Sequence, residues 1–283
     1  MATYVIGDIH GCYETLLSLL DKIAYDKTED RLWMVGDLVN NGPRNAEVIR
    51  WAMEQGDRLV CVLGNHDLHM LAAAHGVRPM RKKDTFQDVL DAPDSRELLR
   101  WMRHRPMLHQ EGDDVMVHAG LLPEWDIELA TSCARELEAV LRDDDNFLVF
   151  FEQMYGNEPL RWSDDLKRTA RLRLTVNAMT RMRAVTRKEG NLEYKYKGTL
   201  AGMPEQLVPW FERADAIEDV RLFFGHWSAI GYHCHESIHA MDAGVTWGNE
   251  LMAMRLEDEA QFHVPTIEGE EAKAATLMKA RTQ

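Results

Sequence analysis

The fold is decided by a stretch in which an apolar run ends in a polar loop, Leu59-Val60-Cys61-Val62-Leu63-Gly64-Asn65-His66-Asp67-Leu68-His69. The five apolar residues at its start, partly β-branched, predict a buried parallel strand. Gly64 predicts a tight turn, and the spacing of Leu68, Leu71 and Ala72 predicts a helix after it. The stretch therefore places an amide, an imidazole and a carboxylate at the carboxyl end of a strand.

The same construction occurs twice before this stretch and twice after it. Apolar runs lead into Gly7-Asp8-Ile9-His10, Gly36-Asp37, His118-Ala119-Gly120 and Gly225-His226-Trp227. Helical periodicity follows the first two runs, and alternating strands and helices with short connections predict a parallel α/β sheet. Ligand-binding residues collect at the carboxyl ends of the strands in such sheets.

Further short strand patterns predict a second, more antiparallel sheet packed on the first: 237–241, 251–256 and 261–264. Helical periodicity predicts a helical excursion within 142–190. The chain shows no convincing linker, so we expect one domain over residues 1–265 and a polar tail over residues 266–283.

The bulk composition fits a soluble globular protein. Of 283 residues, 45% are hydrophobic and 28% are charged, and the four cysteines lack metal-type spacing. No apolar run reaches the roughly 18–20 residues of a membrane span, and no secretion signal is apparent, so we expect a cytoplasmic protein. A net charge of −14 argues against broad binding to nucleic-acid backbones. It allows a polyphosphate substrate that metal ions and a few arginines hold in a cleft.

The polar residues at the strand ends form a ligand set for divalent metals, which bind carboxylate, imidazole and amide groups: Asp8, His10, Asp37, Asn65, His118 and His226. One ion needs only three or four of these ligands, so the set predicts two ions. The first ion takes Asp8 and His10, the second takes Asn65 and the other two histidines, and Asp37 bridges them. Two ions about 3.5–4 Å apart can hold a hydroxide and clamp the oxygens of a phosphoryl group during in-line displacement.

His66 and Asp67 of the central stretch are the candidate catalytic residues. His66 is not needed as a ligand, so we predict that it donates a proton to the leaving oxygen, a role worth typically 10²–10⁴ in rate. Asp67 is predicted to brace the loop through backbone hydrogen bonds.

Five motifs resemble, in order, those of the metallophosphoesterases of the phosphoprotein-phosphatase type: Gly-Asp-Ile-His-Gly (7–11), Gly-Asp-Leu-Val-Asn-Asn-Gly-Pro (36–43), Gly-Asn-His-Asp (64–67), His-Ala-Gly (118–120) and Gly-His-Trp (225–227). Four further stretches are similar to the branch of bacterial symmetrical diadenosine tetraphosphatases: 65–69, 177–183, 224–227 and 241–248. The resemblance extends from residue 1 to about residue 265.

The resemblance implies a four-layer α/β/β/α sandwich with two mixed sheets and a dinuclear centre that takes manganese or cobalt. The implied activity is hydrolysis of diadenosine tetraphosphate to two ADP. Enzymes of this branch also act on related nucleoside-tetraphosphate ends, so capped RNA is a further expected partner.

One position departs from the family pattern where a phosphate is bound. The second motif of the family ends in Arg-Gly-Pro, and here Asn41 replaces the arginine, whose charged fork a neutral amide does not match. Either Arg44 or the pair Arg181 and Arg183 supplies the missing charge, or catalysis is weaker. Residues that lie two apart on a helix diverge, so we expect only one of the pair to face the site. Of the two we favour Arg181.

Aromatic residues offer a surface on which a base can stack. Adenine could stack on Trp162, Trp227 or Trp247, but core packing is the default for tryptophan. Only Trp227 adjoins a metal motif, which makes it the leading candidate of the three.

Three functions fit the sequence. The first is the nucleotide hydrolase. The second is a protein serine/threonine phosphatase of the same fold, which the neutral residues Asn40 and Asn41 disfavour because that branch relies on charge there. The third is a regulatory protein that binds dinucleotides with weakened catalysis, which Asn41 favours and the intact ligand set disfavours.

Overall fold

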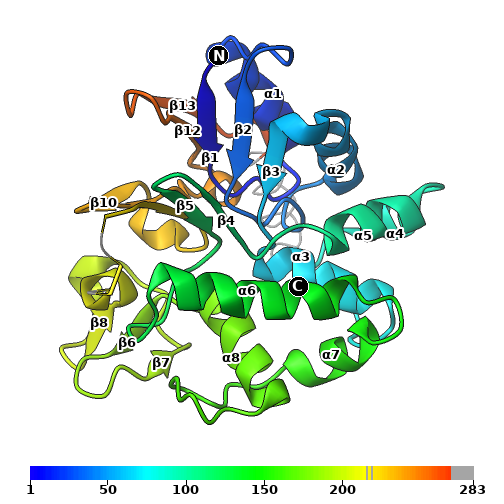
Figure 1. The fold of residues 1–283 in the computed structure, drawn as a ribbon. Helices are drawn as coiled ribbons and strands as arrows, with labels where there is room; N and C mark the ends of the chain where they lie inside the picture. The colour runs from blue at the N-terminus through cyan, green and yellow to red at the C-terminus, as the bar shows by residue number, and fades with distance from the viewer. Residues whose placement is uncertain (215, 218, 269–283) are drawn as a thin grey trace, which may run out of the picture.

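The computed structural model describes residues 1–214, 216–217 and 219–268. Two five-stranded sheets lie between layers of helices (Figure 1). The first sheet has the order β13 (Gln261–Pro265), β12 (Glu250–Arg255), β1 (Thr3–Ile6), β2 (Arg31–Met34), β3 (Leu59–Cys61). The second has the order β10 (His233–His235), β11 (Ile238–Ala240), β9 (Arg221–Phe224), β5 (Asp114–Val117), β4 (Leu108–Glu111). Both sheets mix parallel and antiparallel pairs, so the predicted sandwich with two mixed sheets is confirmed.

The two faces of the first sheet contribute to different parts of the core. Val5 and Trp33 pack with Met116 and Phe223 of the second sheet, in a layer between the sheets. Alternate residues such as Ile6 belong to the larger cluster on the helix side, because successive side chains of a strand point to opposite faces. Burial on both faces explains why continuous apolar runs marked these strands in the sequence.

Two late strands lie in a different sheet from the predicted one. The sequence pattern assigns β12 and β13 to the second sheet, but β12 pairs antiparallel with β1 and β13 pairs antiparallel with β12 in the first sheet. The physical reason is that β12 has apolar side chains on both faces. Met252 lies between the sheets and Leu251 lies on the helix side, so β12 is suited to an interior position.

The helices cover the outer faces of the sheets and the ends of the strands (Figure 1). They are α1 (Tyr13–Lys22), α2 (Asn45–Glu54), α3 (Asn65–Ala74), α4 (Gln87–Leu90), α5 (Ser95–Arg103), α6 (Ile127–Arg142), α7 (Phe147–Met154) and α8 (Arg168–Arg181). The predicted helical excursion corresponds to α7 and α8, which pack on each other and on α6. A small third sheet follows, with the order β7 (Leu192–Glu193), β6 (Ala184–Thr186), β8 (Leu207–Pro209). In the part of the chain that the structure describes, no helix has the length and apolar character needed to cross a membrane.

The start of the predicted tail is packed against the first helix. The residue before α1 is Cys12, and its side chain makes no capping hydrogen bond to that helix. Glu268 is instead buried there, and its carboxylate accepts hydrogen bonds from the backbone N–H groups of Glu14 and Thr15 and from the Thr15 hydroxyl. A carboxylate at this position satisfies free N–H groups and interacts favourably with the helix dipole. Residues 269–283 lie outside the described structure, so the rest of the tail stays a prediction.

We expect Glu268→Ala to lower the free energy of unfolding by about 1–2 kcal/mol, because the first turn of α1 loses its capping carboxylate. Urea denaturation followed by circular dichroism measures the change. Glu54→Ala is the matched control, since Glu54 is exposed at the last residue of α2. Equal stability of the two variants would contradict the capping role.

Candidate metal centre

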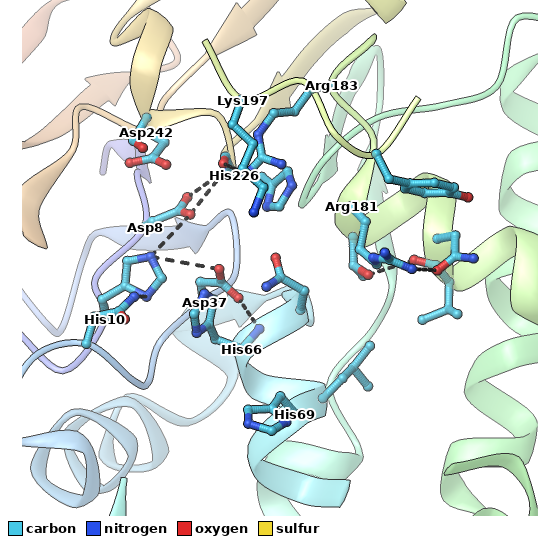
Figure 2. Close-up of a pocket in the computed structure, with 18 of the residues that line it drawn as sticks. Asp8, His10, Asp37, His66, His69, Arg181, Arg183, Lys197, His226 and Asp242 are labelled. Atoms are coloured by element: carbon cyan, nitrogen blue, oxygen red, sulfur yellow. Dashed lines mark hydrogen bonds and ion pairs between the residues drawn. The ribbon is translucent and has the colours of Figure 1, made fainter. Parts of the chain in front are cut away.

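The loops after β1, β2, β3 and β9 surround a cavity of about 460 Å³ (Figure 2). Residues singled out in the sequence line this cavity: Asp8, His10, Asp37, Asn41, Asn65, His66, Arg181, Arg183 and His226. His118, which follows β5, is fully buried next to them, 3.3 Å from Asp37. The structure therefore brings together side chains that are more than 200 positions apart in the chain.

Two of the imidazole rings are held so that one nitrogen of each faces the carboxylates. His10 Nδ1 lies 3.2 Å from the Val39 carbonyl oxygen, and His118 Nδ1 lies 2.8 Å from the Val35 carbonyl oxygen. Each Nδ1 therefore acts as a donor to the backbone, which leaves the lone pair on Nε2. A metal-ligating histidine ordinarily makes such a bond with its second nitrogen.

Asp37 is shared by two groups of possible ligands. Its Oδ2 atom lies 3.8 Å from His10 Nε2 and 3.3 Å from His118 Nε2. One group is formed with His10 and His66, the other with His118 and His226, and the ligand atoms of each group lie within 4.8 Å of one another. A carboxylate between two ligand groups is the arrangement that a bridged pair of ions requires.

The Asn65 amide lies among the groups that would hold the second ion. Turned one way, its nitrogen donates to His226 Nδ1 at 2.8 Å and to the Thr180 carbonyl oxygen at 3.0 Å. Turned the other way, its oxygen lies 3.3 Å from His118 Nε2. Within the described residues, His226 Nε2 is buried without a hydrogen-bond partner, which leaves a ligand nitrogen for an ion. The donor set thus fits a divalent ion.

Asp8 lies in a buried, negatively charged environment. Burial, together with repulsion from Asp242 and Asp37, raises the pKa of Asp8 well above its usual value. Its carboxylate is 3.9 Å from His10 Nε2 and accepts hydrogen bonds from the His226 N–H. A counter-charge relieves the repulsion among these three buried carboxylates, and a divalent ion supplies one.

Backbone strain is concentrated at this site. His10, Asp37 and His226 have positive φ angles of 53°, 50° and 65°, which non-glycine residues rarely adopt. Gly64 and Gly225 allow the loops to approach closely, because a Cβ atom there would overlap the carboxylates of Asp37 and Asp8. Such outliers persist at functional sites when the surrounding structure holds them in place.

Asp67 is a positioning residue. Its buried carboxylate accepts hydrogen bonds from the backbone N–H groups of Gly64 at 2.9 Å, Asp37 at 2.9 Å and Leu38 at 3.0 Å. These bonds join the loop after β2 to the loop after β3, as the bracing prediction requires. Burial and the Asp37 charge raise the pKa of Asp67 to about 7.

The orientation of His66 is set by Asn40. The Asn40 side-chain oxygen accepts from the backbone N–H groups of Asn41 and Thr85, so its amide nitrogen faces His66 Nδ1 at 2.9 Å and Asp84 at 3.0 Å. His66 Nδ1 is therefore an acceptor and Nε2 carries the proton. A protonated nitrogen is not a metal ligand, so His10 and Asp37 are the ligands of the first group, and Asp8 lies 3.9 Å from His10 Nε2.

The arginine predictions need two corrections. Arg44 does not line the cavity, because it pairs with Glu14 and Glu47 and its guanidinium lies 4.8 Å from the Tyr13 ring centre. Arg181 and Arg183 both line the cavity, and the preference for Arg181 alone is wrong. The reason is that α8 ends at Arg181 and Met182 is extended, so the helical spacing does not continue.

Arg183 is the arginine beside the candidate ligands. Its guanidinium donates to the His226 carbonyl oxygen at 3.1 Å. Burial lowers the pKa of Arg183 below its usual value. The nearby carboxylates of Asp242, Asp37 and Asp8 oppose this shift only in part. Arg181 lies farther along the cavity, over the ring of Tyr194.

Trp227 is also placed differently from its prediction as a base-stacking residue. Its side chain is only 1% exposed and does not line the cavity. The indole N–H donates to the Gly198 carbonyl oxygen at 2.9 Å, and the ring packs with Tyr196 and Phe211. Its contribution is therefore to the core beneath the loop after β9.

The sequence reading missed four charged residues of the cavity. Asp242 is 4% exposed and lies beside Asp8 (Figure 2). Its signal is the same strand-end construction, since Met241-Asp242-Ala243-Gly244 follows β11. The others are Arg81, Lys83 and Lys197. The basic residues among them carry no motif in the sequence, and chain folding alone brings them to the site.

We expect Asp37→Asn to reduce bound Mn²⁺ from two ions per chain to less than one, because the shared carboxylate serves both ligand groups. Isothermal titration calorimetry and metal analysis after desalting measure the stoichiometry. His69→Gln is the control, because His69 lines the same cavity but belongs to neither ligand group. Retention of two ions by Asp37→Asn would show that the carboxylate does not bridge.

We also expect Mn²⁺ affinity to fall as the pH is lowered, starting above pH 6.5. Burial favours neutral His118, but the Asp37 carboxylate outweighs burial and raises the pKa of His118 above its usual 6.5. The imidazole therefore holds its proton at higher pH than usual, and an entering ion must displace that proton. Titrations in buffers of different ionisation enthalpy measure the protons released. A flat affinity between pH 8 and pH 6 would contradict this expectation.

Comparison with known proteins agrees with this geometry. The calcineurin-like phosphoesterase family matches residues 1–180. A symmetrical bis(5′-nucleosyl)-tetraphosphatase of Methylobacillus flagellatus is 50% identical over 268 residues, which cover 94% of this chain and 95% of that protein. Its counterpart in Chromobacterium violaceum is 47% identical, with coverage of 98% of this chain and 99% of that protein.

Solved structures show the same fold. A candidate diadenosine tetraphosphatase superposes with a TM-score of 0.63 at 21% identity and covers 94% of both chains. A protein serine/threonine phosphatase from Saccharomyces cerevisiae superposes with a TM-score of 0.54 at 12% identity, covering 94% of this chain and 79% of its own. The chain belongs to the calcineurin-like phosphoesterase family and, within it, to the group of relatives named symmetrical bis(5′-nucleosyl)-tetraphosphatase.

Proposed function

We propose that this protein hydrolyses diadenosine tetraphosphate symmetrically to two ADP with two divalent ions, manganese or cobalt. The observation that carries the proposal is a pair of ligand groups that share Asp37 in a cavity that five basic residues also line. The relatives of this chain that are 47–50% identical over nearly their whole length carry the name of this activity.

The metal ions would be held by Asp8 and His10 on one side and by Asn65, His118 and His226 on the other, with Asp37 between them. Bound ions would polarise a phosphoryl group and lower the pKa of a water molecule to the physiological range. The remaining chemistry belongs to the side chains of the protein. Water adds to one of the two central phosphorus atoms, the bridging P–O bond breaks, and negative charge develops on the oxygen of the departing ADP.

His66 is suited to stabilise that oxygen. Burial lowers the pKa of His66 to about 4, so the ring is neutral at pH 7. A neutral imidazole donates a hydrogen bond and keeps its proton. Asn40 donates to Nδ1, which leaves Nε2–H as the donor available to the departing oxygen. Asp84 holds Asn40 in this orientation, because its carboxylate accepts from the Asn40 amide and from His69.

Other residues of the cavity supply the positive charge that Asn41 lacks. Arg183 lies beside the candidate ligands, and Lys197 lines the same cavity (Figure 2). Positioned cations stabilise phosphoryl oxygens as their charge develops in the transition state. Basic residues thus line the cavity that would hold the substrate phosphates, although the whole chain has a net charge of −14.

Two alternatives stay weaker. A protein serine/threonine phosphatase shares the fold, but Asn40 and Asn41 remove the charge that such an enzyme places in this motif. A regulatory protein with weakened catalysis would not need both ligand groups and an oriented His66. Action on capped RNA and a location in the cytoplasm stay predictions.

Incubation of the purified protein with diadenosine tetraphosphate and Mn²⁺, followed by separation of the products, tests the proposal. Two ADP per substrate is the expected result. AMP plus ATP would mean an asymmetric cut and would overturn it. Binding without product would favour the regulatory protein, and competitive release of phosphate from phosphopeptides would favour the protein phosphatase.

We expect His66→Asn to lower kcat by about 10²–10³ while both ions stay bound, because the variant loses the hydrogen-bond donor to the departing oxygen and no ligand. Turnover of diadenosine tetraphosphate and the Mn²⁺ stoichiometry are measured on the same preparation. Loss of an ion from this variant would mean that His66 is a ligand.

A further inference from the structure

Three aromatic side chains line the cavity, and their surroundings differ. Tyr155 has the guanidinium of Arg78 over its ring at 4.3 Å, and Tyr194 has that of Arg181 at 4.5 Å. Trp247 is 69% exposed. Within the described residues, it has no ring or cation stacked on it, and it is the only aromatic member of the exposed large hydrophobic side chains. An open indole face is therefore available in the cavity.

The turn that carries Trp247 is held by hydrogen bonds and connected to the site. Trp247 ends a short 3₁₀ helix, η5 (Val245–Trp247), between Gly244 and Gly248, whose φ angles are 79° and 81°. The Trp247 N–H donates to the Gly244 carbonyl oxygen at 2.9 Å. The Gly244 N–H in turn donates to Asp242 at 3.0 Å. The buried carboxylate of the cavity thus fixes the turn that holds the indole outward.

Exposure alone assigns no role to Trp247, because single apolar side chains are common on protein surfaces. Its position distinguishes it, since the same cavity is lined by the candidate metal ligands and by basic residues such as Arg183 and Lys197. Metal ions and cations recognise phosphates, but neither recognises a base. A nucleobase is flat and apolar on its faces, and an open indole is the surface that binds such a face.

We propose that Trp247 is the platform on which one nucleobase of the substrate stacks. This role rests on the proposed nucleotide hydrolysis and adds the group that distinguishes a nucleotide from a bare polyphosphate. Stacking on an aromatic side chain strengthens binding by about 5- to 150-fold per base and tolerates different bases. The site therefore takes adenine and guanine alike, and it binds polyphosphates without a base less tightly.

Binding measurements test the platform without any turnover. We compare ADP with inorganic pyrophosphate on the Mn²⁺-loaded native protein, Trp247→Ala and Trp247→Phe by calorimetry. Trp247→Ala is expected to weaken ADP binding by about 5- to 150-fold and to leave pyrophosphate binding unchanged. Trp247→Phe keeps a ring and is expected to retain most of the affinity. Leu17→Ala, which removes an exposed apolar side chain on α1, is the control and should change neither affinity.

Two results would overturn the inference. One is an unchanged ADP affinity in Trp247→Ala, and the other is an equal loss for ADP and pyrophosphate, which would indicate a general disturbance of the cavity. ADP should also quench the tryptophan emission of the native protein, and this quench should be lost in Trp247→Phe. A quench that persists in Trp247→Phe would assign the stacking to another residue.

Kinetics separate this inference from the proposed function. With diadenosine tetraphosphate, Trp247→Ala should raise KM and leave kcat nearly unchanged, because stacking contributes equally to the ground state and the transition state. If two ADP form and KM does not change, the platform is wrong and the proposed function stands. If ADP binds through Trp247 and no product forms, the platform stands and the proposed function fails.

Discussion

The structure depends on a group of buried hydrogen-bond acceptors at the strand ends that face one another and have too few N–H or O–H donors among them. Backbone carbonyl groups hold the Nδ1 atoms of His10 and His118, so both rings present Nε2 to the Asp37 carboxylate. Asn65 adds an amide oxygen to the same space. Each of these groups costs free energy when it is buried alone. Together they form an environment that positive charge stabilises, and the loops, the cavity and its basic rim are arranged around that requirement.

The core makes the unfavourable loop conformations possible. The strands that carry the ligands are buried on both faces, so their ends are fixed in position. Asp67 then joins two of the loops through three backbone N–H groups. With the strand ends and the loops both restrained, His10, Asp37 and His226 keep left-handed backbone angles. The stability of the sandwich is thus partly used to hold a strained site.

The sequence predicted those parts of the site that a local pattern marks. An apolar run followed by glycine and a polar residue locates the end of a buried strand, which is why Asp8, Asp37 and Asn65 could be found. Asp242 follows the same rule after β11, but that strand has only three residues and includes His239, so its pattern is weak.

Residues whose direction depends on distant parts of the chain could not be predicted. Arg44 adjoins a motif, yet its guanidinium forms an ion pair with Glu14 and does not enter the cavity. Trp227 follows a ligand, and its ring turns toward the Gly198 carbonyl, which no local pattern reveals. The exposure of Trp247 depends on how its turn packs against the residues that line the cavity. In the same way, the spacing of β12 does not indicate that its partner is β1.

That pairing of β1 with β12 bears on how the protein is made. The strand formed by Thr3–Ile6 pairs with Glu250–Arg255, which is synthesised long after it. Contacts that close so long a loop form slowly, and unpaired strand edges are exposed to aggregation in the meantime. Because Asp8 follows β1 directly, this candidate ligand gains its final surroundings only after β12 has been synthesised and has paired.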